Sequence, residues 1–364
     1  MNSSNPISIF QIVLLIITAV GLKNHVFAIP PLIQTAQKDS WLSVILALFI
    51  TLLWLFIIIG IYQKTKKENV FQWLLRRVNK WVVYIMIGVL LIVLTIICSE
   101  TLRETITWVH VSLLPQTPRS VTAISFGIVC FLMAKTNLKS ICIINQSLLF
   151  FIVILGFFVA TVNIQYKDYS LLRPIFEHGY APIIRGIIFP LSGFTEFFLV
   201  LIIQDKVKET FRFRHFVITA LLLTGLTIGP LIGAIIEFSQ GEAEKLRFPA
   251  YEEWQLVSIG QFIEHVFFFV IYQWLSGAFI RITFLFYLIR ELLALNKNGK
   301  VIIYAVFIII EILTLFPLSD FKYTEILFYV LLPFSAWFFL GFSILFYLII
   351  YIASKKDRRV NNEA

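Results

Sequence analysis

Charged side chains are scarce in this sequence: they make up 14% of its 364 residues, whereas hydrophobic residues make up 59%. Soluble domains carry about 25% charged residues, so the composition excludes a protein built mainly of soluble domains. Cysteine is also scarce, and Cys98, Cys130 and Cys142 all lie in apolar stretches. The sequence therefore offers neither a disulfide framework nor the ligand spacing of a metal site, and the three thiols should pack as small apolar groups.

Recognisable catalytic patterns are missing as well. The sequence lacks a glycine-rich phosphate loop and the nucleophile pattern GxSxG, so we expect neither an enzyme nor a cofactor-binding protein. The formal net charge is +9, but the basic residues gather in a few loops, as membrane topology requires. We therefore expect no nucleic-acid partner, and the class that remains is an integral protein of the lipid bilayer.

Long apolar stretches recur along the whole chain. A membrane-spanning helix needs about 20 residues. The pattern predicts an all-α membrane protein with about ten transmembrane helices, at residues 7–33, 41–63, 81–111, 121–135, 141–162, 183–204, 213–238, 261–292, 301–316 and 326–352. The fourth and ninth of these spans are short, and residues 239–260 form the longest connection.

Lysine and arginine are distributed unevenly among the connections. They gather at residues 64–80, 135–139, 206–214, 290–300 and 355–359, which all fall on one side if the span count is right. The opposite connections are sparser or acidic, as with Glu242 and Glu252. Because positively charged loops stay in the cytoplasm, we expect a multi-pass protein of the plasma membrane with both termini cytoplasmic.

The sixth span contains residues that interrupt a helix. Pro190 lacks an N–H group, Gly193 permits unusual backbone angles, and Glu196 would lie at membrane depth. A carboxylate there costs about 3 kcal/mol or more unless it has a partner or a wet cavity. This combination is typical of a discontinuous helix that builds a transporter-type site. The alternative is a proline-kinked span with a satisfied glutamate.

A similar interruption occurs in the first span, at residues 21–25 (GLKNH). Two broken helices in corresponding positions indicate an inverted repeat, because an odd number of helices reverses the topology of the second half. We therefore expect one integral membrane domain, with a first repeat at about residues 7–162, a second at about 183–352 and a cytoplasmic tail at 353–364. In such a five-plus-five arrangement, spans one, three, six and eight surround the substrate site.

Ionisable residues lie inside these same four spans. They are Lys23 and His25 in span one, Glu100, Arg103 and Glu104 in span three, Glu196 in span six, and Glu264, His265 and Arg281 in span eight. Charges inside a membrane pair with each other or face water, so we expect Lys23 to pair with Glu196 or with Glu100.

Several of these residues have a second interpretation. Arg103 and Glu104 fit the outer end of a long helix as well as a site, and Glu264 and His265 fit the start of span eight. Arg281 is either a structural ion-pair partner or a site residue, with Gly277 one turn before it for close helix packing. Glu311 in span nine is isolated and is expected to be an ion-pair or interface residue.

The chain resembles the B subunit of the nutrient germinant receptors of endospore-forming bacteria, in the spore germination protein family of the amino acid–polyamine–organocation transporter superfamily. The likeness extends from residue 7 to about residue 352. It rests on residues 7–11 (ISIFQ), 28–30 (AIP), 172–174 (LRP) and 247–252 (RFPAYE), and on the Pro–Gly–Glu pattern of span six. One departure is Lys23-Asn24-His25, where many relatives have small residues with glycine.

This resemblance implies a LeuT-like fold in the spore inner membrane and a complex with an A-type subunit and a C-type lipoprotein subunit. It also implies a small nutrient ligand, usually an amino acid, bound near the membrane midplane without cofactor or metal. The binding residues implied by the match to spans one, three, six and eight are Gly21, Leu22, Lys23, Asn24, Ile96, Ser99, Glu100, Ser192, Gly193, Glu196, Gly277 and Arg281.

Three functions agree with such a fold. The first is a germinant-sensing subunit that binds a nutrient and triggers germination with its partners. The second is a secondary amino acid transporter coupled to H⁺ or Na⁺, which shares the fold and so cannot be separated by fold alone. The third is a passive conduit for water or ions, because a core of interrupted, polar helices can hold water.

Overall fold

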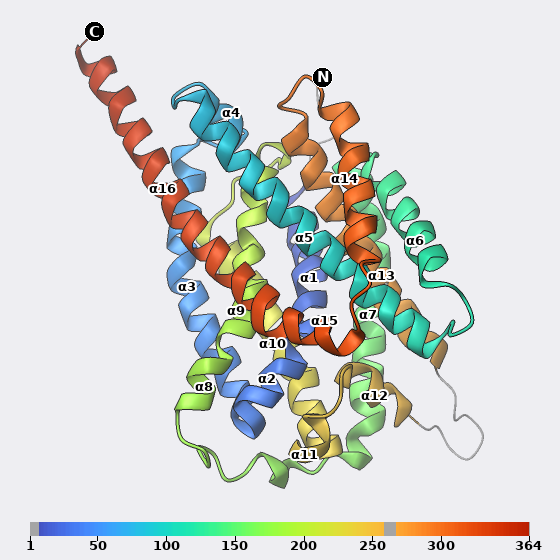
Figure 1. Cartoon of the computed structure of the whole chain (residues 1–364). Helices are drawn as coiled ribbons and strands as arrows, with labels where there is room; N and C mark the ends of the chain where they lie inside the picture. Colours follow the sequence, from blue (N-terminus) through green and yellow to red (C-terminus); the bar gives the residue numbers. More distant parts are fainter. Residues whose placement is uncertain (1–6, 258–266, 364) are drawn as a thin grey trace.

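The computed structural model describes residues 7–257 and 267–363, and Figure 1 shows them as a bundle of long, tilted helices. Within these residues the backbone is helical apart from connecting turns and one isolated parallel bridge between Ile7 and Val207. The expected all-α class is therefore confirmed. Glu264 and His265 lie outside the described residues.

The helices follow the expected order of spans. The first half of the chain contains α1 (Ile9–Leu22), η1 (Lys23–Phe27), α2 (Ile29–Ala36), η2 (Gln37–Asp39), α3 (Ser40–Lys64), α4 (Val70–Leu75), α5 (Lys80–Ser112), α6 (Arg119–Ala134) and α7 (Leu138–Val162). After η3 (Asn163–Tyr166) and η4 (Tyr169–Leu172), the second half contains α8 (Ala181–Gly186), α9 (Ile188–Phe194), η5 (Thr195–Ile202), η6 (Gln204–Lys206), α10 (Phe213–Phe238), α11 (Gln240–Ala243), α12 (Pro249–Gln255), α13 (Phe267–Leu293), α14 (Gly299–Thr314), α15 (Asp320–Ile326), η7 (Leu327–Leu331) and α16 (Leu332–Glu363).

Eight helical stretches of the described chain are long and apolar enough to cross a membrane. The other two expected spans correspond to α6 and α14, which have 16 residues each. At 1.5 Å per residue they are about 24 Å long, less than the hydrocarbon thickness of a bilayer. Their crossing of the membrane, like the inverted pairing of residues 7–162 with 183–352, stays a prediction.

Large apolar side chains cover the outside of the bundle. On α3, for example, Phe49, Leu53 and Phe56 are all more than half exposed and follow one another at helical spacing. A soluble protein of this size would not leave such a continuous apolar face in water. The exposed faces therefore agree with a lipid environment.

The basic connections lie at one end of the bundle. The Lys67 ammonium donates to the carbonyl of Lys208, and the Lys208 N–H donates to the carbonyl of Ile7 at 2.8 Å. Figure 1 places α4 and the C-terminal end of α16 at this same end, and α11 and α12 at the opposite end. We call these the α4 end and the α12 end. The expected gathering of basic loops at one end is thus found.

We predict that the α4 end faces the cytoplasm. Single cysteines placed at two exposed positions, Lys66→Cys at the α4 end and Glu242→Cys at the α12 end, test this with a membrane-impermeant maleimide. We expect intact cells to show labelling of Glu242→Cys only, and both variants to be labelled after permeabilisation. Labelling of Lys66→Cys in intact cells would reverse the topology.

The described part of the longest connection, residues 239–257, is more ordered than a plain loop. It contains the short helices α11 and α12, and Pro249 occupies the first turn of α12, where its missing N–H has no helical partner to lose. Arg247, just before α12, donates to Glu104 of α5. The connection is therefore tied to the end of the third span.

Both expected interruptions are present as changes of helix type. In span one, α1 passes into the π-helical turn η1, and the Ala28 N–H donates to the Lys23 carbonyl at 3.0 Å. In span six, α9 passes at Thr195 into the 3₁₀ segment η5, whose first turn contains Glu196. Such local changes of helix type often mark functional sites. Here they turn Lys23 and Glu196 toward one another.

Candidate functional site

Three charged side chains from three separate spans meet in the interior. The Lys23 ammonium lies 3.1 Å from Oε1 of Glu196, while the Arg281 guanidinium donates through Nη1 to Oε2 at 2.7 Å and through Nη2 to Oε1 at 2.9 Å. All three residues are 0% exposed. We call them the buried charge cluster. The arrangement is a two-point arginine–carboxylate pair with a second cation on one carboxylate oxygen.

Neutral groups complete the coordination of both cations. Lys23 also donates to the hydroxyl of Ser335 at 2.9 Å. Arg281 donates through Nε to the hydroxyl of Thr101 at 3.0 Å and through Nη1 to the carbonyl of Ala19. Because buried charges are costly without such partners, these contacts explain how the cluster is tolerated. They also bring α1, α5 and α16 to the same point as η1, η5 and α13.

Glu100 lies near the cluster without joining its hydrogen bonds. Its side chain interacts electrostatically with Lys23, Arg281 and Glu196. It is 2% exposed, and neither carboxylate oxygen has a hydrogen-bond partner among the described residues. Two cations and one carboxylate leave the buried charge cluster with a net charge of +1. An ionised Glu100 would make the group neutral, but an unpartnered carboxylate in this position is also an available acceptor.

The expected pairing of Lys23 with a glutamate is confirmed in its Glu196 form. The second interpretation of Arg281, a structural ion-pair partner, is also met by its bond to the same carboxylate. His25 points elsewhere, with Nδ1 3.2 Å from the carbonyl of Leu226 on α10. The sequence therefore identified the charged residues that meet here, but not that Lys23 and Arg281 share the carboxylate of Glu196.

Side chains of span one pack closely against two of the predicted glycines, Gly193 and Gly277. The amide of Asn24 donates to the Pro190 carbonyl at 3.2 Å, and a Cβ at Gly193 would overlap its Oδ1 atom. Leu22 similarly lies against Gly277, 3.3 Å from the position of a Cβ. These contacts let span one approach spans six and eight closely.

Among the described residues, the remaining predicted binding residues form no hydrogen bond with a member of the cluster. Gly21 faces Leu223 and Leu226 of α10. The hydroxyls of Ser192 and Ser99 donate back to the Phe189 and Ile96 carbonyls of their own helices. Their expected role in ligand binding stays a prediction.

Two contacts of the cluster were missed from the sequence. Thr101 donates to the Ile97 carbonyl of its own helix, as helix threonines commonly do, and only its lone pairs serve Arg281. Ser335 lies in span ten, which carries no ionisable residue at that depth. Neither side chain gives a signal in sequence that distinguishes it from an ordinary helix residue.

Arg103 and Glu104 belong to a different part of the protein. Arg103 donates to the carbonyls of Thr314, Phe316 and Leu318, and Glu104 pairs with Arg247 at 2.8 Å. They lie toward the α12 end, which agrees with the helix-end interpretation. The isolated Glu311 is 7% exposed and packs against Gly127 of α6, and it has no hydrogen-bond partner among the described residues.

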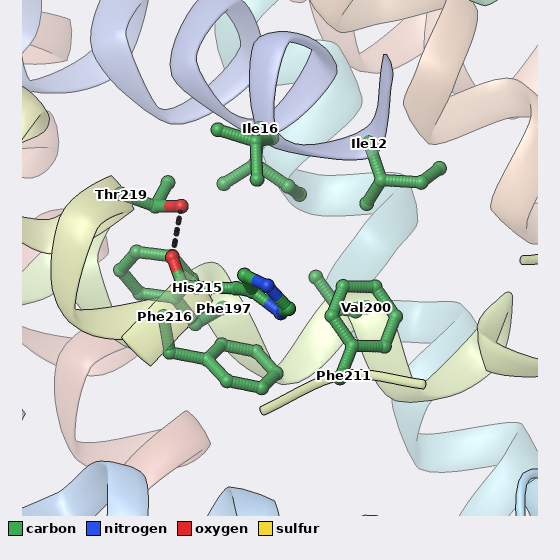
Figure 2. Close-up of a pocket in the computed structure, with 9 residues that line it drawn as sticks. Ile12, Ile16, Phe197, Val200, Phe211, His215, Phe216 and Thr219 are labelled. Carbon is green, nitrogen blue, oxygen red and sulfur yellow. Dashed lines mark hydrogen bonds between the residues drawn. The ribbon is translucent and has the colours of Figure 1, made fainter. Parts of the chain in front are cut away.

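Figure 2 shows a small cavity between α1, η5 and α10 that does not suit a charged ligand. Most of its labelled side chains are apolar, with Ile12, Ile16 and Val200 among them. The His215 ring also lines it, and the Thr219 hydroxyl is turned to the His215 carbonyl. The buried charge cluster does not line this cavity. The cluster is therefore the better candidate for recognising a polar ligand.

Comparison with known proteins gives the chain a family. A family model described as spore germination protein matches residues 6–320. A relative from Bacillus anthracis, spore germination protein XB, is 36% identical over 354 residues, which cover 97% of this chain and 99% of that protein. The match extends over nearly the whole of both proteins, which agrees with a shared architecture. The chain belongs to the spore germination protein family.

Proposed function

We propose that this chain is the nutrient-sensing subunit of a germinant receptor. The observation that carries the proposal is the buried charge cluster, in which Lys23, Glu196 and Arg281 converge from three spans with no exposure. Intramembrane ionisable residues are expensive and usually functional. In a spore germination protein, the function that such a site supports best is recognition of a small charged nutrient.

An amino acid is the ligand class that fits the charges. Its carboxylate would compete with Glu196 for the cluster's net positive charge, most readily at Lys23, which holds that glutamate through one oxygen. Its ammonium would find an acceptor in Glu100, whose carboxylate oxygens are unpartnered in the described structure. The cluster and Glu100 together thus offer complementary charges to both ends of a zwitterion.

Binding of this kind would favour a second conformation. The cations of the described structure are engaged by internal partners, so a ligand must replace some of those contacts. Moving a two-state equilibrium from 1:99 to 99:1 requires about 5.5 kcal/mol of differential affinity. We propose that this change is passed, in the spore inner membrane, to an A-type subunit and a C-type lipoprotein subunit, with both termini of this chain in the cytoplasm.

Glu100 gives the sharpest test of this site. We predict that Glu100→Gln raises the nutrient concentration needed for half-maximal germination about tenfold or more, which corresponds to a loss of about 1.4 kcal/mol of binding free energy. The change keeps the side chain's size and removes its charge. Germination rate as a function of nutrient concentration, measured in spores with equal amounts of the protein, gives the result.

Glu311→Gln is the matched control for this test. Glu311 is also a buried carboxylate without a hydrogen-bond partner among the described residues, but it packs on α6 rather than beside the cluster. We expect its substitution to leave the nutrient response unchanged. Equal shifts in the two variants would mean that Glu100 has no special place in ligand recognition.

A secondary transporter is the second candidate, and the same unpartnered Glu100 favours it, because a carboxylate that can gain and lose a proton suits an H⁺-coupled carrier. Uptake of labelled amino acid into proteoliposomes separates the two functions. Concentrative uptake by the isolated chain would replace a receptor-only role with transport.

A further inference from the structure

A second cavity lies toward the α12 end, apart from the buried charge cluster. It has a volume of about 200 Å³ and lies among α5, α6 and the segment that joins α14 to α15. Its lining residues are Arg103, Ile106, Thr107, Arg119, Thr314, Leu315, Phe316, Pro317 and Leu318. Water occupies about 30 Å³ per molecule in the liquid, so the cavity has room for a small organic ion.

Arg103 carries a positive charge that no acidic side chain neutralises by direct contact in the described structure. Its Nη atoms donate to the neutral carbonyls of Thr314, Phe316 and Leu318, at 3.2, 2.7 and 2.9 Å. The residue is 5% exposed, and its Nε–H has no hydrogen-bond partner among the described residues. An arginine buried to this degree normally has every N–H group engaged.

The surrounding charges do not remove this excess. Arg119 is paired with Asp320 through two hydrogen bonds, at 2.9 and 2.8 Å, and Arg247 is paired with Glu104 at 2.8 Å. Three arginines and two carboxylates leave a net charge of +1. The two ion pairs account for four of these groups, so the remaining charge is that of Arg103, on the wall of the cavity.

We propose that this cavity is a binding site for a small carboxylate, which the charge of Arg103 and the partly exposed guanidinium of Arg119 would attract. Both arginines line a space of suitable volume, and the Arg103 guanidinium is also held over the Tyr323 ring, 4.2 Å from its centroid. Arginine is the residue best suited to recognise a carboxylate. The site stands apart from the buried charge cluster and does not depend on the function proposed for it.

The position of the site on α5 connects it to Glu100. Arg103 follows Glu100 by three residues, which places the two on one face of the helix. Thr314 bridges the same region, because its carbonyl accepts from Arg103 and its hydroxyl donates to the Ser99 carbonyl at 3.4 Å. A carboxylate bound to Arg103 would compete with the carbonyls of the α14–α15 segment and so loosen the wall between the cavity and Glu100.

Charge-selective cysteine labelling tests the site in the full-length protein in detergent without anionic lipid. Leu318→Cys places a thiol in the lining, and the native cysteines Cys98, Cys130 and Cys142 are buried. The Leu318→Cys thiol is reacted with anionic sulfonatoethyl methanethiosulfonate and with cationic trimethylammonioethyl methanethiosulfonate. The rate of each reaction is divided by the rate of the same reagent with free cysteine. We expect the anionic reagent to be favoured about tenfold, because a positively charged recess concentrates anions.

Acetate is the probe for the site itself. At constant ionic strength, we expect acetate to slow the anionic reagent saturably and more than chloride does. Arg119→Gln and Arg103→Gln should each weaken both the charge preference and the acetate protection, while Arg185→Gln, an exposed arginine on α8, should leave both unchanged. Arg119 is about one-third exposed, so its variant serves if Arg103→Gln does not accumulate. Equal rates for the two reagents, or acetate and chloride acting alike, would overturn the proposal.

Discussion

Replacing Glu196 with glutamine is expected to abolish the germination response and to reduce the amount of the protein in the membrane. The carboxylate is the shared acceptor of Lys23 and Arg281, and all three residues are fully buried. Removing one partner of a buried ion pair leaves an uncompensated charge and costs about 3–5 kcal/mol. Here one substitution leaves two cations without their carboxylate.

Immunoblots of spore membranes and germination assays at saturating nutrient measure these two effects separately. Glu311→Gln, which removes a buried carboxylate that pairs with no cation in the described structure, is the control for loss of charge alone. We expect it to preserve both abundance and response. If Glu196→Gln spores contain normal amounts of the protein and germinate like the control, the cluster has neither a structural nor a functional role.

Much of the fold could be predicted because membrane helices depend on local composition. With no water in the bilayer core, the backbone must satisfy its own hydrogen bonds, so a long apolar stretch is necessarily helical. Span three, expected at residues 81–111, is found as α5 (Lys80–Ser112). The ordered helices α11 and α12 were not predicted, because they lie outside the apolar core and depend on contacts such as Arg247 with Glu104.

The site was predictable in its charged members and not in its geometry. Lys23, Glu196 and Arg281 stand out because a charge inside an apolar span requires a partner. The sequence could not decide between Glu196 and Glu100 as the acceptor for Lys23, because that choice depends on how η1 and η5 rotate the two side chains. The interruptions expected in spans one and six are found as π and 3₁₀ turns that continue the helices, and the positive charge near them comes from side chains.

The described structure also changes what a mutation of Lys23 should do. Lys23 holds Glu196 by one hydrogen bond of 3.1 Å, while Arg281 holds the same carboxylate by two. Lys23→Met therefore leaves Glu196 paired, and the three groups change from a net charge of +1 to neutral. We expect a smaller loss of protein than in Glu196→Gln, together with a weaker response to nutrient because the site has lost a cation.

The double variant Lys23→Met/Glu196→Gln is expected to accumulate better than Glu196→Gln alone. In that single variant two buried cations lack a carboxylate, whereas in the double variant only Arg281 does, and it keeps its contacts with Thr101 and Ala19. Substitutions of residues that share one ion-pair network do not have additive effects on stability, and their coupling energies are about 0.5–3 kcal/mol.

The unsubstituted protein, the two single variants and the double variant would be compared by their abundance in the membrane and by thermal unfolding after purification. Their germination rates would also be measured as a function of nutrient concentration. Ser335→Ala is the control for Lys23, since it removes the other hydrogen-bond partner of the ammonium without changing charge. Strictly additive losses of stability in the double variant would exclude coupling between Lys23 and Glu196. A Lys23→Met protein of normal stability that only needs more nutrient would instead place the ammonium in direct contact with the ligand.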